Sequence, residues 1–244
     1  MSDRCILRLT GPDTHDFLQG LVTNDVTGLK RGLVYAALLT PQGKYLADFF
    51  LVPSENDVLL DVQADLGPML LQRLSMYKLR ANVGIEPATL HLHRGLTDTP
   101  KDAFPDPRHD ALGWRAYRAA PANADTTDWD AIRVTHMIPE TGIELHSDTF
   151  ILEAGFEALN GVDFRKGCYV GQEVTARMKH KTTLRKGLAR VALSEPAEPG
   201  TPIDANGKAA GTLHTVSGKT ALAYLRFDRA SENMKAGDAS VTRL

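Results

Sequence analysis

Apolar and polar positions in the first part of the chain alternate in short runs, which predicts strands joined by tight turns. Cys5–Leu9 has the two-residue period of a strand. A helix is expected after Gly11-Pro12-Asp13, because proline is favoured in a first helical turn. Apolar runs at Gly32–Leu39 and Tyr45–Val52 flank Pro41-Gln42-Gly43-Lys44, and that turn chemistry predicts a hairpin.

The middle of the chain continues in the same manner, with short strands and a helix. Strands are expected at Val58–Val62, Val83–Ile85, Leu90–Leu92 and Trp114–Arg118. The spacing of Leu66, Leu70 and Leu74 predicts a helix. Residues 97–112 contain three prolines among polar residues, which predicts an irregular loop.

Beyond Arg185 the pattern changes to short β-prone runs separated by turns that contain proline or glycine. These runs are Gly187–Leu193, Gly211–Val216 and Thr220–Leu225. Evenly spaced short strands of this kind are typical of a small β-barrel. We therefore expect an α+β fold with a barrel at its C-terminal end.

Composition narrows the class of protein. The chain has 244 residues, of which 43% are hydrophobic, enough for a substantial core. No run approaches the roughly 18 apolar residues of a membrane span, and the first residues lack the layout of a secretory signal. The cytoplasm is therefore the expected location, and no membrane partner is expected.

Cysteine and histidine usage argues against a resident metal. Cys5 and Cys168 are the two cysteines of the chain, too few for a disulfide framework or a zinc finger. His136, on a helix that Thr126 or Thr127 can cap, has no second histidine at metal-binding spacing, so it is expected to pack or cap.

Positive charge is concentrated in one segment. Residues 165–190 contain eight Lys or Arg and one acidic residue, Glu173, a net charge of +7 in a chain whose total is −2. Such a block attracts phosphate, a polyglutamate tail, nucleic acid or an acidic partner. The alternative, that it is a solvated helix face, is equally compatible with the charges alone.

The same segment begins with a constrained cysteine. Gly167 and Gly171 flank Cys168, and their conformational freedom predicts a tight turn that presents the thiol at the surface. Arg165 and Lys166 lie beside it, and nearby cations favour the thiolate, the form that attacks electrophiles and binds metals. The alternative is a small buried side chain, which free cysteine often is.

These residues carry a resemblance to a known family over nearly the whole chain. Lys166-Gly167-Cys168-Tyr169 runs into Gly171-Gln172-Glu173 and Arg177, which resembles the K-G-C-Y-x-G-Q-E motif of the YgfZ-type folate-binding family. That family is related to the glycine-cleavage T-protein, an aminomethyltransferase. Weaker matches are Phe17-Leu18-Gln19-Gly20, Thr23-Asn24-Asp25-Val26 and Leu39-Thr40-Pro41-Gln42-Gly43.

The resemblance implies a T-protein-like folate-binding domain over residues 1–184, with mixed or antiparallel sheets and helices, and a barrel domain over 185–244. It also implies a role in assembly or repair of iron–sulfur proteins, linked to four-iron clusters. The implied partners are A-type iron–sulfur carrier proteins, client iron–sulfur enzymes and the small molecule tetrahydrofolate. Implied cofactor-binding residues are Asn24, Asp25, Asp48, Arg133, Tyr169, Gln172, Glu173 and Arg177.

Two positions depart from the related pattern. Ala47 stands where T-proteins usually carry a second aspartate beside the residue matched by Asp48. Thr135 stands where relatives often carry a glutamate that contacts the pterin ring, and a hydroxyl cannot offer the bidentate, charge-assisted pairing of a carboxylate. Weakened tetrahydrofolate binding is therefore expected.

The leading hypothesis assigns the chemistry to Cys168, Lys166 and Asp48. One cysteine cannot hold a conventional cluster, which takes about four ligands, so Cys168 is expected to bind a cluster transiently and no permanently bound metal is expected. A folate-dependent one-carbon transferase is the first alternative, and the sequence does not decide whether the protein is an enzyme. The second alternative is an RNA-associated or tRNA-modification-related protein. A nucleic-acid partner is nevertheless not expected, because Tyr169 is the only aromatic residue in the basic block on which a base could stack.

Overall fold

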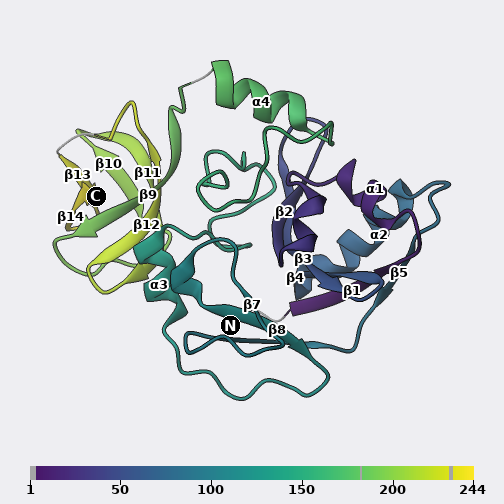
Figure 1. Ribbon diagram of the computed structural model, residues 1–244. Coiled ribbons are helices and arrows are strands. Elements are labelled where there is room, and N and C mark those ends of the chain that lie inside the picture. Colours follow the sequence, from purple (N-terminus) through teal and green to yellow (C-terminus); the bar gives the residue numbers. More distant parts are fainter. Residues whose placement is uncertain (1–3, 182, 231–232) are drawn as a thin grey trace. The chain divides into compact units, whose positions relative to one another are not determined.

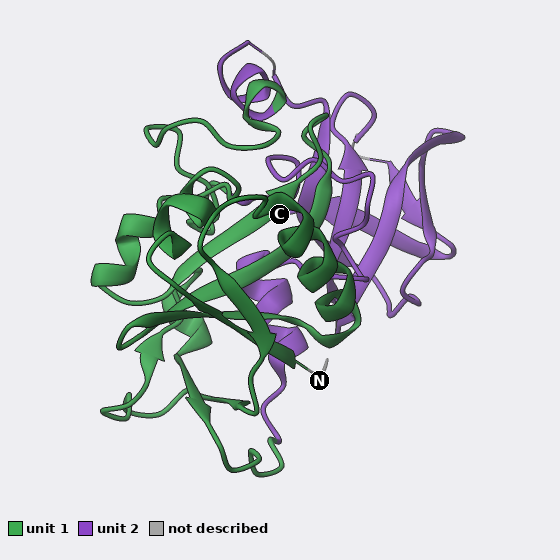
Figure 2. Ribbon diagram, turned by 90° about the vertical axis from the view of Figure 1, so that its right-hand side faces the viewer, with its two compact units in different colours: residues 1–125, 157–174 green, residues 126–156, 175–244 purple. Residues whose placement is uncertain are grey.

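The computed structural model describes residues 4–181, 183–230 and 233–244 (Figure 1). The chain divides into two compact units, and each is built from two separate stretches of sequence. Unit 1 contains residues 1–125 and 157–174, and unit 2 contains residues 126–156 and 175–244 (green and purple in Figure 2). The expected domain boundary after residue 184 separates the barrel strands from the remainder of the chain and stays a proposal.

Unit 1 is built on a five-stranded antiparallel sheet in the order β2-β3-β4-β1-β5. The strands are β1 (Arg4–Thr10), β2 (Val34–Leu39), β3 (Tyr45–Ser54), β4 (Asp57–Gln63) and β5 (Gly84–Pro87). The predicted hairpin is confirmed, since β2 pairs with β3 and Leu38 lies opposite Ala47. The strands expected around residues 5–9, 58–62 and 83–85 are present as well.

One face of this sheet is apolar and is covered by helices. Its residues include Ala47, Phe49 and Leu51 of β3, which are 0% exposed. The covering helices are α1 (Thr14–Gln19), α2 (Gly67–Tyr77) and the 3-10 helices η1 (Val26–Lys30) and η2 (Ala64–Leu66). Because side chains alternate along a strand, Asp48 and Phe50 point to the other face.

The other face carries a buried network of charges. Asp61 of β4 is 0% exposed and accepts hydrogen bonds from Arg4 Nε at 2.5 Å, from Arg115 Nη2 at 2.5 Å and from the Tyr117 hydroxyl at 2.8 Å. Burial alone raises the pKa of Asp61, but the two guanidinium groups outweigh it and hold that pKa below its usual range. The network therefore stabilises unit 1 only while the aspartate is ionised.

Arg115 and Tyr117 come from a second, three-stranded sheet in the order β6-β8-β7. Its strands are β6 (His91–Gly95), β7 (Phe104–Pro105) and β8 (Trp114–Arg118), and the 3-10 helix η3 (Asp110–Leu112) lies between β7 and β8. The expectation of an irregular loop over 97–112 was therefore wrong in part, because β7 and η3 lie within it. Proline is tolerated in β7 because this is an edge strand.

Unit 2 contains the barrel, a helix and the residues from 175 onward of a further helix. Strands close in the order β10-β11-β12-β9-β14-β13 around a core of small and branched apolar side chains. Their bounds are β9 (Lys186–Leu193), β10 (Pro202–Ala205), β11 (Lys208–Ser217), β12 (Thr220–Arg226), β13 (Met234–Ala236) and β14 (Ala239–Arg243). The barrel is confirmed; the sequence pattern identified β9, β11 and β12 and missed the other three.

Helix α3 (Trp129–His136), which lies wholly in unit 2, starts later than expected. Its N-cap is Asp128, whose carboxylate accepts a hydrogen bond from the Ala131 N–H at 3.0 Å, so the expected cap at Thr126 or Thr127 was wrong. An aspartate closer to the first helical turn provides the stronger acceptor. A further helix, α4 (Gln172–Lys181), follows the cysteine motif.

None of the helices in the described ranges is both long and apolar enough to cross a membrane.

Candidate functional site

The thiol of Cys168 lies in a loop of unit 1 that ends at α4, and it is both free and exposed. The neighbours on either side of the exposed Gly167-Cys168 pair are buried, Lys166 at 9% and Tyr169 at 7% exposure. The loop therefore has an exposed tip between two fixed points, as the flanking glycines predicted.

Lys166 fixes the first of these points. Its ammonium donates hydrogen bonds to the Gln19 carbonyl at 2.8 Å and to the Val22 carbonyl at 2.5 Å, and its Nζ lies 5.0 Å from the centroid of the Tyr169 ring. Burial lowers the pKa of Lys166 to about 8, against the opposing charges of nearby carboxylates. This arrangement supports a tethering role, and the catalytic role expected for Lys166 stays a prediction.

Gly171 fixes the second point by packing against the β2–β3 turn. Its φ is +83°, and a Cβ there would lie 2.6 Å from the Thr40 carbonyl oxygen and 3.0 Å from Leu39 Cβ. Gly43 of the turn, with φ +75°, faces Val174 as closely, since a Cβ on it would lie 2.8 Å from Val174 Cβ. The two glycine motifs noted separately in the sequence are thus in contact.

We expect Gly171→Ala to destabilise the protein by about 2–4 kcal/mol, because a side chain at positive φ and a backbone clash each cost about 1–3 kcal/mol. The measurement is the free energy of unfolding in urea. Gly167→Ala is the matched control, since Gly167 has ordinary φ and a Cβ there meets nothing within 4 Å. Equal stability of the two variants would contradict the proposed packing.

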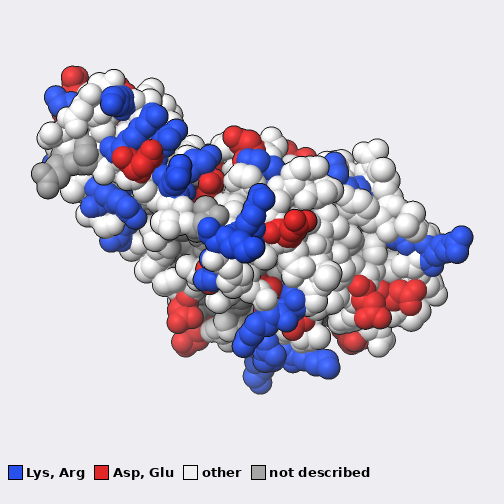
Figure 3. All heavy atoms as spheres, turned by 90° about the horizontal axis from the view of Figure 1, so that it is seen from above, with Lys and Arg blue, Asp and Glu red and all other residues white. Residues whose placement is uncertain are grey.

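The remaining motif residues lie on α4. The Gln172 N–H donates to the Tyr169 carbonyl at 3.3 Å, which joins the loop to the helix. Glu173 and Arg177 are exposed. Figure 3 views the side on which α4 lies in Figure 1, and Lys and Arg side chains project from the surface there. Cofactor binding by these residues stays a prediction.

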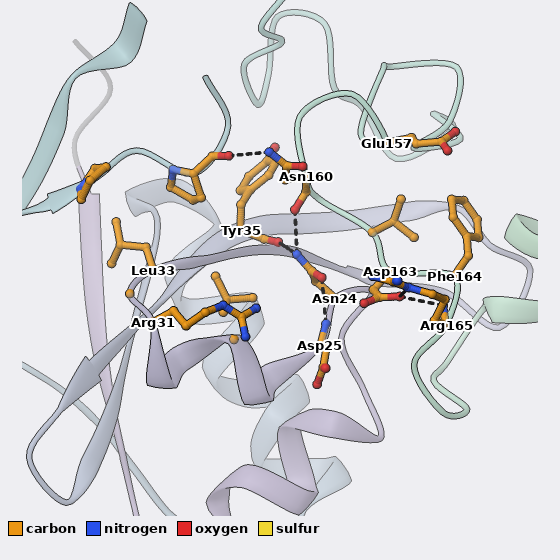
Figure 4. Close-up of a pocket in the computed structure, with 16 residues that line it drawn as sticks. Asn24, Asp25, Arg31, Leu33, Tyr35, Glu157, Asn160, Asp163, Phe164 and Arg165 are labelled. Atoms are coloured by element: carbon orange, nitrogen blue, oxygen red, sulfur yellow. Dashed lines mark hydrogen bonds and ion pairs between the residues drawn. The ribbon is translucent and has the colours of Figure 1, made fainter. Parts of the chain in front are cut away.

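Asn24 and Asp25 line a cavity of about 700 Å³ in unit 1, together with residues of the 157–165 segment (Figure 4). The Asn24 amide donates to the Tyr35 carbonyl at 2.8 Å and to the Asn160 carbonyl at 2.7 Å, and its oxygen accepts from the Asp25 N–H at 2.8 Å. Hydrogen bonds from Thr27 lower the pKa of Asp25. Both side chains hold the chain around the cavity in place.

Asp48 does not line this cavity. It is 7% exposed and accepts hydrogen bonds from the Tyr35 hydroxyl at 3.0 Å and the Tyr45 hydroxyl at 2.6 Å. Burial, and then the charge of Asp48, raise the pKa of Tyr35 well above its usual range, so the Tyr35 hydroxyl keeps its proton and donates it to the carboxylate. The two tyrosines were missed in the sequence, because nothing in strand spacing shows that their hydroxyls meet one carboxylate.

Arg133 and Thr135 belong to α3 of unit 2. Arg133 is 5% exposed, and its guanidinium donates to Glu144 at 2.5 Å and to Asp130 at 2.8 Å. Glu144 in turn accepts from the Thr215 hydroxyl of β11 at 2.5 Å, so Arg133 joins the helix, the following loop and the barrel. Thr135 is exposed, and its hydroxyl donates to the Ala131 carbonyl of its own helix at 2.7 Å.

Side chains that could bind a metal do not gather in the described part of the chain. Across residues 4–181, 183–230 and 233–244, no three His, Cys, Asp or Glu side chains come together as a metal site. Cys5 is half-buried in β1, and a Cβ on Gly67 would lie 2.7 Å from its sulfur. Burial raises the pKa of Cys5, and the charge of Asp61 adds to the effect. Of the two thiols, that of Cys168 is the more accessible to solvent.

Comparison with known proteins gives the relatives of the chain. Residues 185–243 match the family model "CAF17, C-terminal beta-barrel domain". The chain is 32% identical over 275 residues to "Iron-sulfur cluster assembly factor IBA57, mitochondrial" of Mus musculus, covering 93% of this chain and 77% of the mouse protein. It is 32% identical over 216 residues to the Mycosarcoma maydis homolog, covering 75% of this chain and 54% of that protein. The chain thus spans about half the length of that fungal relative.

A solved structure shares the fold. The glycine cleavage system aminomethyltransferase T from Bartonella henselae aligns with a TM-score of 0.78 and 15% identity over 100% of this chain and 83% of that chain. The expected T-protein-like α+β fold is confirmed.

The relatives also correct the expected location. The mammalian and fungal ones are named as mitochondrial proteins, so the prediction of a cytoplasmic protein was wrong. Two free cysteines indicate a compartment that keeps thiols reduced, and they do not distinguish one such compartment from another.

Proposed function

The chain belongs to the family of the iron–sulfur cluster assembly factor IBA57, and from this premise we propose that it acts in iron–sulfur cluster assembly through the thiol of Cys168. One observation carries the proposal: the sulfur is free and exposed at the tip of a loop held at both ends. Because such a loop is already ordered, its side chain loses little further conformational entropy when it binds a partner.

The proposed chemistry is a transient ligand exchange with the cluster as cargo. The Cys168 thiol gives its proton to solvent, and the thiolate sulfur donates an electron pair to one iron of a cluster held by another protein. One thiolate ligand of that protein leaves the same iron and takes up a proton from solvent. Clusters take about four ligands, mostly thiolates, so the other ligands come from the partner. Release reverses the step, with no change of oxidation state at the sulfur.

Replacing Cys168 with alanine tests this proposal in cells that lack their own copy of the protein. The readout is the activity of an enzyme that depends on a four-iron cluster. Unchanged activity would remove the thiol from the mechanism.

We propose tetrahydrofolate binding separately, since no step above uses folate. The residues expected to hold it have protein partners: Asn24 binds backbone carbonyls, Asp48 binds two tyrosines and Arg133 binds carboxylates. Thr135 donates to its own helix where relatives often carry a glutamate. The fit of these side chains to a folate is therefore poor, and weak binding is the expected state of this chain.

We expect Thr135→Glu to strengthen tetrahydrofolate binding by about tenfold or more, because a hydrogen bond to a charged group contributes about 1.5–3 kcal/mol. Isothermal titration calorimetry of the purified protein with tetrahydrofolate gives the Kd. Thr126→Glu is the control, because it adds the same charge at another exposed threonine. Equally tight binding by the wild type and by Thr135→Glu would show that this position does not limit folate affinity.

A further inference from the structure

Helix α2 of unit 1 packs on the sheet with one side and meets solvent with the other. The packed side includes Leu70 and Leu74, which are 0% exposed. The solvent side of a surface helix usually carries charged residues. On α2 the exposed side chains carry no charge, and their spacing places them on one face: Pro68, Gln72, Ser75 and Met76.

The same face ends in a projecting leucine. Met76 and Leu79 are 67% and 87% exposed, the two most exposed large apolar side chains in the described ranges. Leu79 follows the C-cap of α2 and has φ +44°, in the left-handed region that glycine adopts at the end of a helix without steric strain. A leucine here strains the backbone and leaves its side chain in water, and neither effect stabilises unit 1. Residues held in such conformations are concentrated at functional positions.

The loop that carries Leu79 is held in place by hydrogen bonds. The Lys78 ammonium donates to the Val83 carbonyl at 2.9 Å, and the Asn82 N–H donates to the Asp13 carboxylate at 2.7 Å. Because the loop is ordered before it meets a partner, little conformational entropy is lost when Leu79 becomes buried there.

The charge around this apolar face is positive. Residues 66–85 contain Arg73, Lys78 and Arg80 and no acidic residue. Within the described part of the chain, none of these three cations forms an ion pair with a carboxylate. Apolar tips surrounded by cations are complementary to a surface with negative charge outside and an apolar interior.

We propose that residues 72–80, which we call the α2 tip, rest on an anionic lipid surface. Met76 and Leu79 enter the boundary between headgroups and acyl chains, and Arg73 and Arg80 lie at the level of the headgroup phosphates. The expectation of no membrane partner rested on the lack of a spanning segment, and a helix end that lies on a membrane needs none. This binding goes beyond the proposed function and uses no part of the thiol loop.

The size of the α2 tip favours a lipid surface over a protein partner. Helix α2 has 11 residues, so it is about 16 Å long and about 10 Å wide. Each partner in a stable protein complex buries about 800 Å², more than this face offers. None of the exposed residues between 67 and 80 is aromatic, the kind of side chain that contributes most at protein interfaces. A lipid surface requires no minimum area, because a few apolar side chains and cations already give reversible attachment.

The test measures sedimentation of the purified full chain with vesicles of phosphatidylcholine alone and of phosphatidylcholine with about one third cardiolipin, an anionic lipid. Leu79→Gly removes the apolar side chain and relieves the strain at positive φ. We expect this variant to bind the anionic vesicles about tenfold more weakly and to have a Tm a few degrees higher than wild type. A merely structural role of Leu79 would not lower binding while raising the Tm.

Met137→Gly is the matched control. Met137 is an exposed apolar residue with φ +54° at the end of α3, but the exposed residues of that helix include Asp130, which anionic lipid repels. We expect this variant to bind within about twofold of wild type. Arg73→Gln with Arg80→Gln is expected to lose most of the preference for anionic over neutral vesicles. Binding of the wild type is expected to weaken between about 50 mM and about 200 mM salt.

Three results overturn the proposal. The first is a wild type that does not bind the anionic vesicles. The second is Leu79→Gly that binds them as tightly as wild type does. The third is a dimer of the wild type that Leu79→Gly dissociates, without vesicle binding, because the occupant of the α2 tip is then a second copy of the chain.

Discussion

Cells that carry Cys168→Ala in place of the wild-type protein are expected to lose about tenfold or more of their four-iron enzyme activity, to the level of cells without the protein. Alanine has no electron pair to donate to iron, and the other cysteine, Cys5, is half-buried in β1. The purified variant is expected to unfold within about 0.5 kcal/mol of wild type, because the side chain is exposed. The loss then reports chemistry and not folding.

Two controls sharpen this experiment. Cys5→Ala removes the half-buried thiol and is expected to keep the enzyme activity. An enzyme with a two-iron cluster, assayed in the same cells, shows whether the effect is limited to four-iron clusters. Full activity with Cys168→Ala would leave the exposed sulfur without a function, even if the fold and the family assignment stand.

Asp61→Asn is expected to lower the free energy of unfolding by about 3–5 kcal/mol, the cost of breaking a buried ion pair. The amide keeps the shape of the carboxylate and removes its charge. Arg115 is then left buried beside Asp106, whose carboxylate is 3.5 Å from its Nη1, and Arg4 loses its pairing at 2.5 Å. Urea unfolding of the purified protein measures the change.

The control lies on the same strand. Asp57→Asn removes the partner of Arg8 in a pair whose side chains are 34% and 24% exposed, and it is expected to cost about 1 kcal/mol or less. The pH dependence gives a second readout. Because the pKa of Asp61 is lowered in the folded state, the unfolded state binds its proton first as pH falls. Wild-type stability therefore declines below about pH 4, and Asp61→Asn is expected to decline less steeply. Parallel curves for the two proteins would contradict the role of Asp61.

Local patterns predicted the elements well where turn chemistry or period was strong. The hairpin of β2 and β3 followed from Pro41-Gln42-Gly43-Lys44 between two apolar runs. Of the three missed barrel strands, β10 and β13 have four and three residues, too few for a two-residue period to stand out. Their pairing is set by barrel closure, which is a property of the whole domain.

The sequence predicted the exposed thiol of the site, and it did not predict the contacts that hold the loop on either side of the thiol. Two glycines around a cysteine suggested an exposed turn, and Cys168 is exposed. The partners of Lys166 are main-chain carbonyls of Gln19 and Val22, 147 and 144 residues away, and a carbonyl leaves no mark in a sequence. From the sequence, a lysine beside a cysteine was interpreted as an activating charge, and that role stays a prediction. The contacts of its ammonium add a role as an anchor of the loop.

The split composition of unit 1 has a consequence for synthesis of the chain. Residues 1–125 emerge from the ribosome first, but the stretch 157–174 that completes the unit follows the first part of unit 2. Domains tend to fold as units in order of synthesis. The cysteine-bearing stretch is thus the last piece of its unit to arrive, after the residues that hold it. A polypeptide that ends before residue 157 has no organised thiol to offer to iron, and display of the thiol marks the completion of unit 1.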